Sequence, residues 1–272
     1  MMRYIKSLPI ILTLGLIVLI ASCENDKTTN PEDQAPAIPP QSTMLIDFSE
    51  FPDTTSGLED QIVSRNNWGW AYSNVRVWNS VLTLTLATQV AAFLESFNHR
   101  PVQQPDGSWL WQYNVTNQEP IYTAKLYAKT TTDGVEWRML LTKVGEFTDF
   151  EWFTGFSNLP ATEGTWTLNK DPNTPTEFLD IEWYRDTQEE TASVKYTKVA
   201  PAINGQSYIF YGKTNEIPYN RFYQIFGAEE NRLIDIKWNY EMKFGRVKDP
   251  IRFGVENWYC WDENLNDTNC PE

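Results

Sequence analysis

Residues 179–183 read Leu-Asp-Ile-Glu-Trp and residues 234–238 read Ile-Asp-Ile-Lys-Trp, so apolar and polar side chains alternate with a period of two. Successive side chains of a β-strand point to opposite faces of a sheet, and each stretch therefore predicts a strand with one buried and one solvated face. The same alternation predicts further strands from Ser108 onward, at 108–115, 120–130, 134–143, 149–157, 164–170, 176–186, 192–199, 206–213, 220–227, 232–242 and 251–261.

The connections between these strands are short and carry turn residues, for example Thr132-Asp133-Gly134. Short connections allow only antiparallel neighbours, because a parallel crossover needs a dozen or more residues. About eleven such strands in succession predict a meander, and a sheet that long has to curl, split or close.

A helix is predicted over residues 74–97, where apolar side chains recur at spacings of three and four. Ser73 or Asn74 is the expected cap, and Trp68 and Trp70 are expected in a preceding turn or short helix. For residues 81–86 a strand is the alternative prediction, since threonines and leucines alternate there. The predicted fold class is mainly β (α+β), with a long antiparallel meander over 105–272 curled into a half-barrel or barrel. A helical cap over 44–104 packs on it, and residues 44–272 form a single globular domain.

The composition excludes several classes of function. The chain has 272 residues, a formal net charge of −14 and one histidine, His99. It lacks the basic footprint of a nucleic-acid binder. The sequence contains no phosphate-binding glycine loop, no Gly-x-Ser-x-Gly motif and no zinc-ligand spacing. We therefore predict no catalytic residue, no metal site and no cofactor.

The N-terminus carries a targeting signal. Arg3 and Lys6 precede an apolar stretch from Leu8 to Ile20 that is shorter than the ~20 residues of a membrane span and is typical of a secretory signal. The stretch ends in Leu-Ile-Ala-Ser-Cys at residues 19–23, which resembles the lipobox of bacterial lipoproteins. The resemblance implies removal of a signal peptide, residues 1–22, acylation of Cys23 and anchoring in the cell envelope. We expect the outer membrane, with the periplasmic and the surface face both open.

Residues 24–43 have no aromatic side chain and contain Pro31, Pro36, Pro39 and Pro40. They predict that residues 23–43 form an acylated, disordered tether. Loss of Arg3 and Lys6 takes the net charge from −14 to −16, and an acidic body should stand off from anionic lipid.

Cys260 and Cys270 would meet an oxidising compartment after export, which predicts a disulfide, with two free thiols as the alternative. Between them lie Asp262, Asn264, Asn266 and Asp267. These residues lack the glycine and the closing bidentate acid of a calcium loop.

Two aromatic stripes admit two interpretations, as core or as the lining of a ligand site. One is Trp109, Trp111 and Tyr113, and the other is Phe150, Trp152, Thr154 and Phe156. Trp109, Trp111, Tyr113 and Trp152 are the candidate ligand-binding residues. Asp180 and Glu182 share a strand face and suggest either a glycosidase carboxylate pair or a solvated face.

Gly107-Ser108-Trp109 and Gly164-Thr165-Trp166 match the short Gly-x-Trp signature of lipocalin-like barrels, and the order of a helix followed by a meander resembles the half-barrel lipoprotein carriers. These resemblances imply a binding fold. The sequence therefore favours a membrane-anchored lipoprotein with a non-catalytic binding or structural role, holding an apolar or glycan ligand or an envelope protein. The alternative is a surface polysaccharide hydrolase that uses sheet carboxylates.

Overall fold

The computed structural model describes residues 34–53, 65–116, 121–199 and 206–271. The predicted signal peptide and Cys23 lie outside the described residues. The described residues from Ala35 onward belong to one compact unit.

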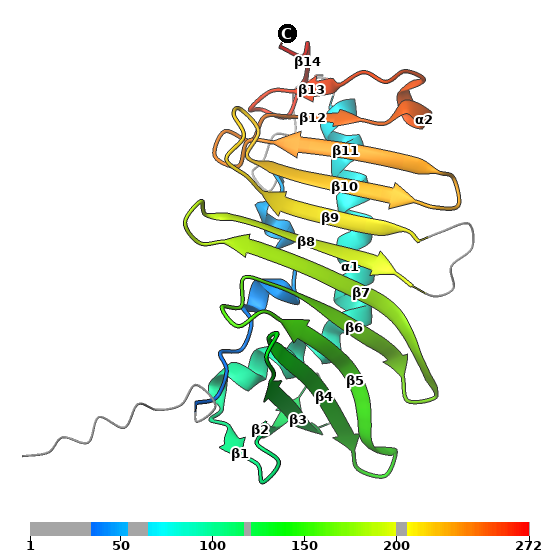
Figure 1. Cartoon of the computed structure of the whole chain (residues 1–272). Helices are drawn as coiled ribbons and strands as arrows, with labels where there is room; N and C mark the ends of the chain where they lie inside the picture. The colour runs from blue at the N-terminus through cyan, green and yellow to red at the C-terminus, as the bar shows by residue number, and fades with distance from the viewer. Residues whose placement is uncertain (1–33, 54–64, 117–120, 200–205, 272) are drawn as a thin grey trace, which may run out of the picture. The chain divides into compact units, whose positions relative to one another are not determined.

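Within the described residues, fourteen strands form one sheet in strict sequence order, and every neighbouring pair is antiparallel (Figure 1). The prediction of a mainly β fold built on an antiparallel meander is confirmed. The strands are β1 (Val102–Gln103), β2 (Trp109–Thr116), β3 (Ile121–Thr130), β4 (Val135–Lys143), β5 (Phe147–Ser157), β6 (Glu163–Asp171), β7 (Thr174–Asp186), β8 (Thr191–Lys198), β9 (Tyr208–Lys213), β10 (Arg221–Gly227), β11 (Arg232–Trp238), β12 (Gly245–Lys248), β13 (Tyr259–Trp261) and β14 (Asp267–Thr268).

The sheet is not closed, so the closed-barrel form of the prediction is wrong. β1 and β14 are its two edges, and each is two residues long. Very short edge strands leave few unpaired backbone groups for another chain to pair with. The predicted strand at 251–261 is also wrong in its first part, where α2 (Pro250–Phe253) stands. Asp249 caps this short helix and Pro250 occupies its first turn, which is a favoured helix start.

The long helix α1 runs from Asn66 to Glu95 and is followed by a 3₁₀ turn, Ser96–Asn98. It begins before the predicted start, includes Trp68 and Trp70, and has no strand at 81–86. Its cap comes from the far end of the chain, because the Asp267 carboxylate accepts hydrogen bonds from the amides of Asn66 (3.2 Å) and Asn67 (2.8 Å). A carboxylate at a helix N-terminus satisfies free amides and complements the helix dipole.

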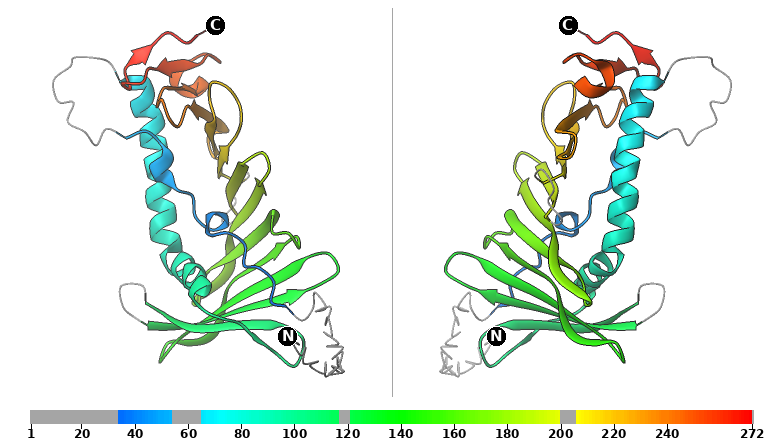
Figure 2. Two further views of the ribbon diagram at one scale, coloured as in Figure 1. Left: turned by 90° about the vertical axis from the view of Figure 1, so that its left-hand side faces the viewer. Right: turned by 90° about the vertical axis from the view of Figure 1, so that its right-hand side faces the viewer.

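Residues 35–53, here called the strap, run between α1 and the sheet (Figure 2). Met44, Ile46 and Phe51 of the strap are buried, and two 3₁₀ turns, Gln41–Thr43 and Phe48–Glu50, shape it. The indole of Trp166 donates to Thr43 Oγ1 (3.2 Å), so the body includes residues that were expected in the tether. The folded part begins at Ala35 and not at Met44.

The strap is fixed to the sheet by a partly buried cluster around Glu50. Arg221 Nε lies 2.7 Å from Glu50 Oε2, and the Tyr211 hydroxyl donates to the same oxygen. The Trp238 indole donates to the Glu50 carbonyl at 3.1 Å. Burial, together with the Glu50 carboxylate, raises the pKa of Tyr211, so the phenol stays protonated and continues to donate.

Glycines opposite tryptophans let neighbouring strands approach closely on the inner face, which is the face that carries the strap and α1. Gly155 pairs with Trp166 and Gly164 pairs with Trp183. A Cβ atom on Gly164 would lie 2.3 Å from the Phe156 carbonyl and 2.5 Å from the Trp183 ring. The indole therefore occupies the space over the missing side chain, which explains Gly164-Thr165-Trp166 by cross-strand packing.

We predict that Gly164→Ala lowers the free energy of unfolding by ~1–3 kcal/mol, the usual range for overpacking. The measurement is denaturant unfolding followed by tryptophan fluorescence. Gly227→Ala is the matched control, because nothing lies within 4 Å of its added Cβ, and it should change stability by less than ~0.5 kcal/mol. Equal effects of the two substitutions would contradict the close-approach argument.

The inner face and α1 share an aromatic core. Phe93 is fully buried, and its ring packs edge-on against Phe153 and Trp166 with centroid distances of 6.2 and 5.4 Å. Leu82 is also buried, Trp78 is half-buried against the same core, and Phe97 is 38% exposed.

Phe93→Ala should lower the free energy of unfolding by ~3–5 kcal/mol, the range for a buried aromatic residue. Phe97→Ala changes a more exposed ring in the 3₁₀ turn that follows α1 and should have less than half that effect. Thermal and denaturant melts of the two variants measure the difference. A Phe93→Ala protein that melts like the parent would refute the packing of α1 on the sheet.

Candidate functional site

The four aromatic residues predicted to bind a ligand lie on the inner face and belong to its core. Trp111, Tyr113 and Trp152 are buried, and Trp109 is half-buried against the same cluster. Tyr113 donates its hydroxyl to the Ala92 carbonyl of α1 at 2.5 Å, and burial raises the pKa of this phenol. None of the four lines any of the hollows described below. Their packing favours the core interpretation.

The second predicted stripe is split between the two faces by a β-bulge. Met139 pairs with Phe153 and Leu140 pairs with Glu151, which leaves Trp152 as the extra residue of β5. Phe150 and Trp152 therefore pack inside, at 5.3 Å between ring centroids, while Thr154 and Phe156 follow on the outer face. A one-residue bulge reverses the side-chain alternation, and the sequence pattern alone did not reveal it.

An apolar pocket of about 280 Å³ lies between the strap and α1. Met44, Leu45, Leu82, Leu86 and Val90 line it, with Tyr196 from β8. Ligand pockets usually measure about 300–1,000 Å³. The pocket between the strap and α1 therefore falls just below that range.

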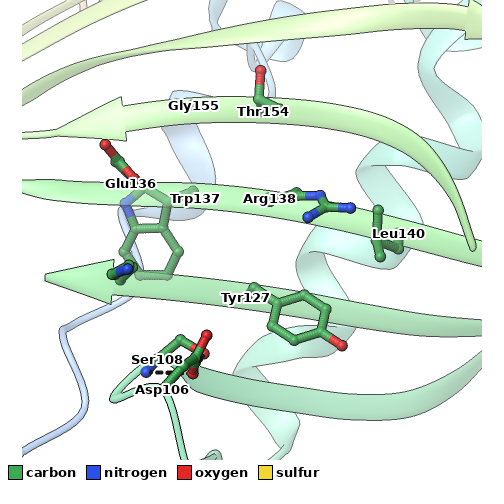
Figure 3. A pocket seen from close by; sticks show the side chains of 10 residues that line it. Asp106, Ser108, Tyr127, Glu136, Trp137, Arg138, Leu140, Thr154 and Gly155 are labelled. Carbon is green, nitrogen blue, oxygen red and sulfur yellow. Dashed lines mark hydrogen bonds between the residues drawn. The ribbon is translucent and has the colours of Figure 1, made fainter. Parts of the chain in front are cut away.

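A larger hollow of about 600 Å³ opens on the other face of the sheet, over β3, β4 and β5 (Figure 3). Tyr127 and Lys129 come from β3, Glu136 and Arg138 from β4, and Thr154 from β5. The turn before β2 adds Asp106 and Ser108 at its rim. These side chains face outward because their strand neighbours Leu126, Ala128, Trp137 and Met139 are buried on the inner face.

The residues that line this hollow carry two positive charges, Lys129 and Arg138, and two negative charges, Asp106 and Glu136, and Arg138 Nε also pairs with Glu151 Oε2 at 2.8 Å. Ser108 donates to Asp106 Oδ1 from its hydroxyl (2.7 Å) and its amide (3.0 Å), and these two bonds lower the pKa of Asp106. Asp106 is therefore an ionised acceptor at neutral pH. A general acid needs the opposite, a raised pKa.

Strand register extends this surface across the outer face in two rows, here called the outer rows. Directly paired residues in a sheet lie side by side, so each row crosses the strands. The first row reads Lys129, Glu136, Phe156, Thr165, Glu182, Lys195, Phe210, Gln224 and Asp235. The second row reads Tyr127, Arg138, Thr154, Thr167, Asp180, Thr197, Tyr208, Phe226 and Leu233.

A second outer hollow of about 430 Å³ lies where the rows cross β7 to β10. Tyr208 stacks on Phe226 at 5.4 Å, and Lys195 Nζ lies 4.8 Å from the centre of the Tyr208 ring. Phe210 meets Phe222 edge-on at 5.0 Å. Aromatic rings on a solvent-facing sheet surface that also carries Lys, Glu and Gln are typical of binding surfaces rather than of a core.

Asp180 and Glu182, the candidate hydrolase pair, lie in these rows. Their paired neighbours are Thr167 and Thr197 for Asp180, and Thr165 and Lys195 for Glu182. Asp180 accepts a hydrogen bond from Thr167 at 2.8 Å. Threonine hydroxyls and a lysine ammonium are ordinary cross-strand neighbours of carboxylates on a solvated sheet face. This environment favours the interpretation as a solvated, charge-paired face.

Cys260 and Cys270 form a disulfide in the structure. In the loop between them, Asp262 Oδ1 accepts from the amides of Asn264 and Asn266, both at 2.9 Å, while Asp267 caps α1. His99 stacks on Tyr113 at 4.7 Å and contacts Glu95 at 2.9 Å. Within the described ranges, no group of three or more His, Cys, Asp or Glu residues is arranged to hold a metal ion.

Sequence reasoning missed Tyr127 and Arg138, although both strands were predicted. The available signal was an aromatic ring at a polar-face position, since Tyr127 lies two residues from Lys125 and two from Lys129 and so shares their face of the strand. That Tyr127 lies in one row with Arg138 and Tyr208 follows only from the register of the strands. Comparisons of this chain with protein family models, curated proteins and solved structures found no match.

Proposed function

We propose that this chain is a membrane-anchored bacterial lipoprotein of the cell envelope that binds a glycan, without catalysis, on the outer face of its curled sheet. The observation that carries the proposal is the division of the two faces. The inner face is covered by the strap and α1, whereas the outer face presents hollows with aromatic rings, hydroxyls and balanced charges.

A glycan matches this surface chemically. A sugar ring has an apolar C–H face, which stacks on rings such as Tyr127, and a rim of hydroxyls that both donate and accept hydrogen bonds. Asp106 and Glu136 can accept from those hydroxyls, and Lys129 and Arg138 can donate to them. Because the local charges cancel, a neutral ligand suits the hollow better than an anion, which the acidic body would repel.

The resemblance to half-barrel lipoprotein carriers is part of the proposal at the level of architecture. An open, curled meander with a helix on one face is the form that such a carrier takes. The filled inner face distinguishes the proposed binding mode from that of a carrier, because the ligand would bind outside the curl. The hydrolase alternative gains no support from its candidate pair, because Asp180 accepts a hydrogen bond from Thr167 and Glu182 lies beside Lys195, as on a solvated sheet face.

The anchor belongs to the same proposal and rests on the Leu-Ile-Ala-Ser-Cys motif at residues 19–23. Two or more acyl chains anchor a protein stably, whereas one chain binds only marginally. We propose the outer membrane as the location. The proposal covers attachment to either the periplasmic or the surface face of that membrane.

Cys23→Ala should convert the protein from a detergent-phase to an aqueous-phase species, because acylation needs the thiol. Phase partitioning of the wild type and the variant, expressed in a bacterium with a lipoprotein pathway, measures this. Ser22→Ala, which keeps a small residue and the cysteine, is the control and should stay in the detergent phase. Aqueous partitioning of all three proteins would refute the anchor.

Tyr127→Ala should weaken glycan binding about 2- to 10-fold, because a stacking contact contributes ~0.5–1.5 kcal/mol and tenfold corresponds to 1.4 kcal/mol. Arg138→Gln should also weaken binding by removing the guanidinium fork. The measurement is calorimetric titration of the full chain with soluble glucose, xylose and N-acetylglucosamine oligosaccharides.

Tyr240→Ala is the matched control for this titration, because Tyr240 is an exposed tyrosine that lies in neither outer hollow. It should bind like the wild type. If none of the three oligosaccharide series binds, or if Tyr127→Ala and Tyr240→Ala behave alike, the glycan proposal at this hollow is wrong.

A further inference from the structure

The middle of α1 carries no charge. Between Arg76 and Glu95 every residue is apolar or neutral. By length and composition the helix could cross a membrane, and a core helix of a soluble protein passes the same test when most of it is buried. In α1, 28% of the most apolar window is buried inside the protein. The composition therefore exceeds what packing on the strap and sheet requires.

The apolar excess lies on one line of the helix. Val77, Val81 and Leu84 follow one another at spacings of four and three, and they are 61%, 49% and 82% exposed. These three residues are here called the outward stripe. The buried residues Val75, Leu82, Leu86 and Phe93 lie on the other side of the helix and belong to the core. Figure 2 shows the strap and the sheet along one side of α1. An exposed apolar line on an acidic protein indicates an interaction surface.

Polar side chains beside the outward stripe make their hydrogen bonds within the helix. Thr85 Oγ1 donates to the Val81 carbonyl at 2.5 Å, and Thr83 Oγ1 donates to Asn79 Oδ1 at 3.0 Å. Bonds of this kind satisfy hydroxyls without water or a partner protein. Moving these two threonines into an apolar medium therefore leaves neither hydroxyl without an acceptor.

The proposed anchor brings a lipid surface within reach of this face. The chain from Cys23 to Ala35 can span at most ~40 Å when fully extended. α1 has 30 residues and is about 45 Å long, so the bilayer lies within about one helix length of the body. Charge selects the orientation, because a body with net charge −16 is repelled by anionic lipid except where its surface is neutral.

We propose that the outward stripe of α1 lies against the surface of the lipid bilayer, so that the anchored body docks on its helix and turns the outer rows of the sheet away from the membrane. This inference rests on the proposed anchor at Cys23. A second copy of the chain is the competing occupant, and mutual repulsion of two strongly acidic bodies opposes it.

The test uses the full-length acylated protein on phosphatidylcholine vesicles that contain a nitroxide-labelled lipid. A fluorophore is attached through Leu84→Cys in one sample and through Val144→Cys in the other. Val144 is the matched control, since it is an apolar residue in the turn after β4 and is 90% exposed. Both positions are exposed, so labelling leaves the core intact. We expect the Leu84 probe to lose fluorescence to the nitroxide lipid and to shift to the blue, and the Val144 probe to do neither.

Flotation of the vesicles separates failure of the anchor from failure of docking. Protein that does not float overturns the anchor and docking together. Protein that floats with both probes equally unquenched overturns docking alone. A Leu84 probe that is shielded from aqueous iodide but unquenched by the nitroxide lipid, with a cross-linked dimer, shows that a second copy occupies the stripe and also overturns the proposal. With Val81→Asp added, the quenching of the Leu84 probe should be lost.

Discussion

The aromatic inner face of the sheet has to be kept from water, and the rest of the structure depends on how α1 and the strap cover it. Both ends of α1 are tied to the sheet. At the start, Asp267 of β14 binds the first helix amides, and near the end Tyr113 of β2 binds the Ala92 carbonyl. Because α1 is fixed to β2 near one edge of the sheet and to β14 at the other edge, it holds the open meander in one curl. Most of the stability of the helix comes from this packing.

The strap makes the third layer of the same core. Without it, the indoles of Trp166 and Trp238 would lack their partners at Thr43 and Glu50, and a buried donor without a partner is costly. The Glu50–Arg221 pair closes this layer at the sheet. Because removing one member of a buried pair leaves an uncompensated charge, the strap and the sheet depend on each other.

Covering the inner face with α1 and the strap leaves two external surfaces, the outer face of the sheet and the outward side of α1. The sheet has a second face, and its outward positions are free to carry Tyr127, Arg138 and the aromatic pairs of β9 and β10. The helix has a second side, and its outward stripe remains apolar although it does not serve the core. A single layer of helix over a sheet thus produces two external surfaces of different chemistry, one mixed and polar and one neutral and apolar.

The sequence by itself determined the antiparallel meander, because an alternation of period two and short turns admit little else. It also singled out Cys260 and Cys270, which the structure joins, and the apolar helix around residues 74–97. Tertiary structure decided what depends on partners far along the chain. The cap of α1 is Asp267, the strap is held by tryptophans of β6 and β11, and the bulge at Trp152 sends Phe150 and Phe156 to opposite faces. The rows that unite Tyr127 with Tyr208 exist only through strand register, which a local pattern cannot encode because each strand is read without its neighbours.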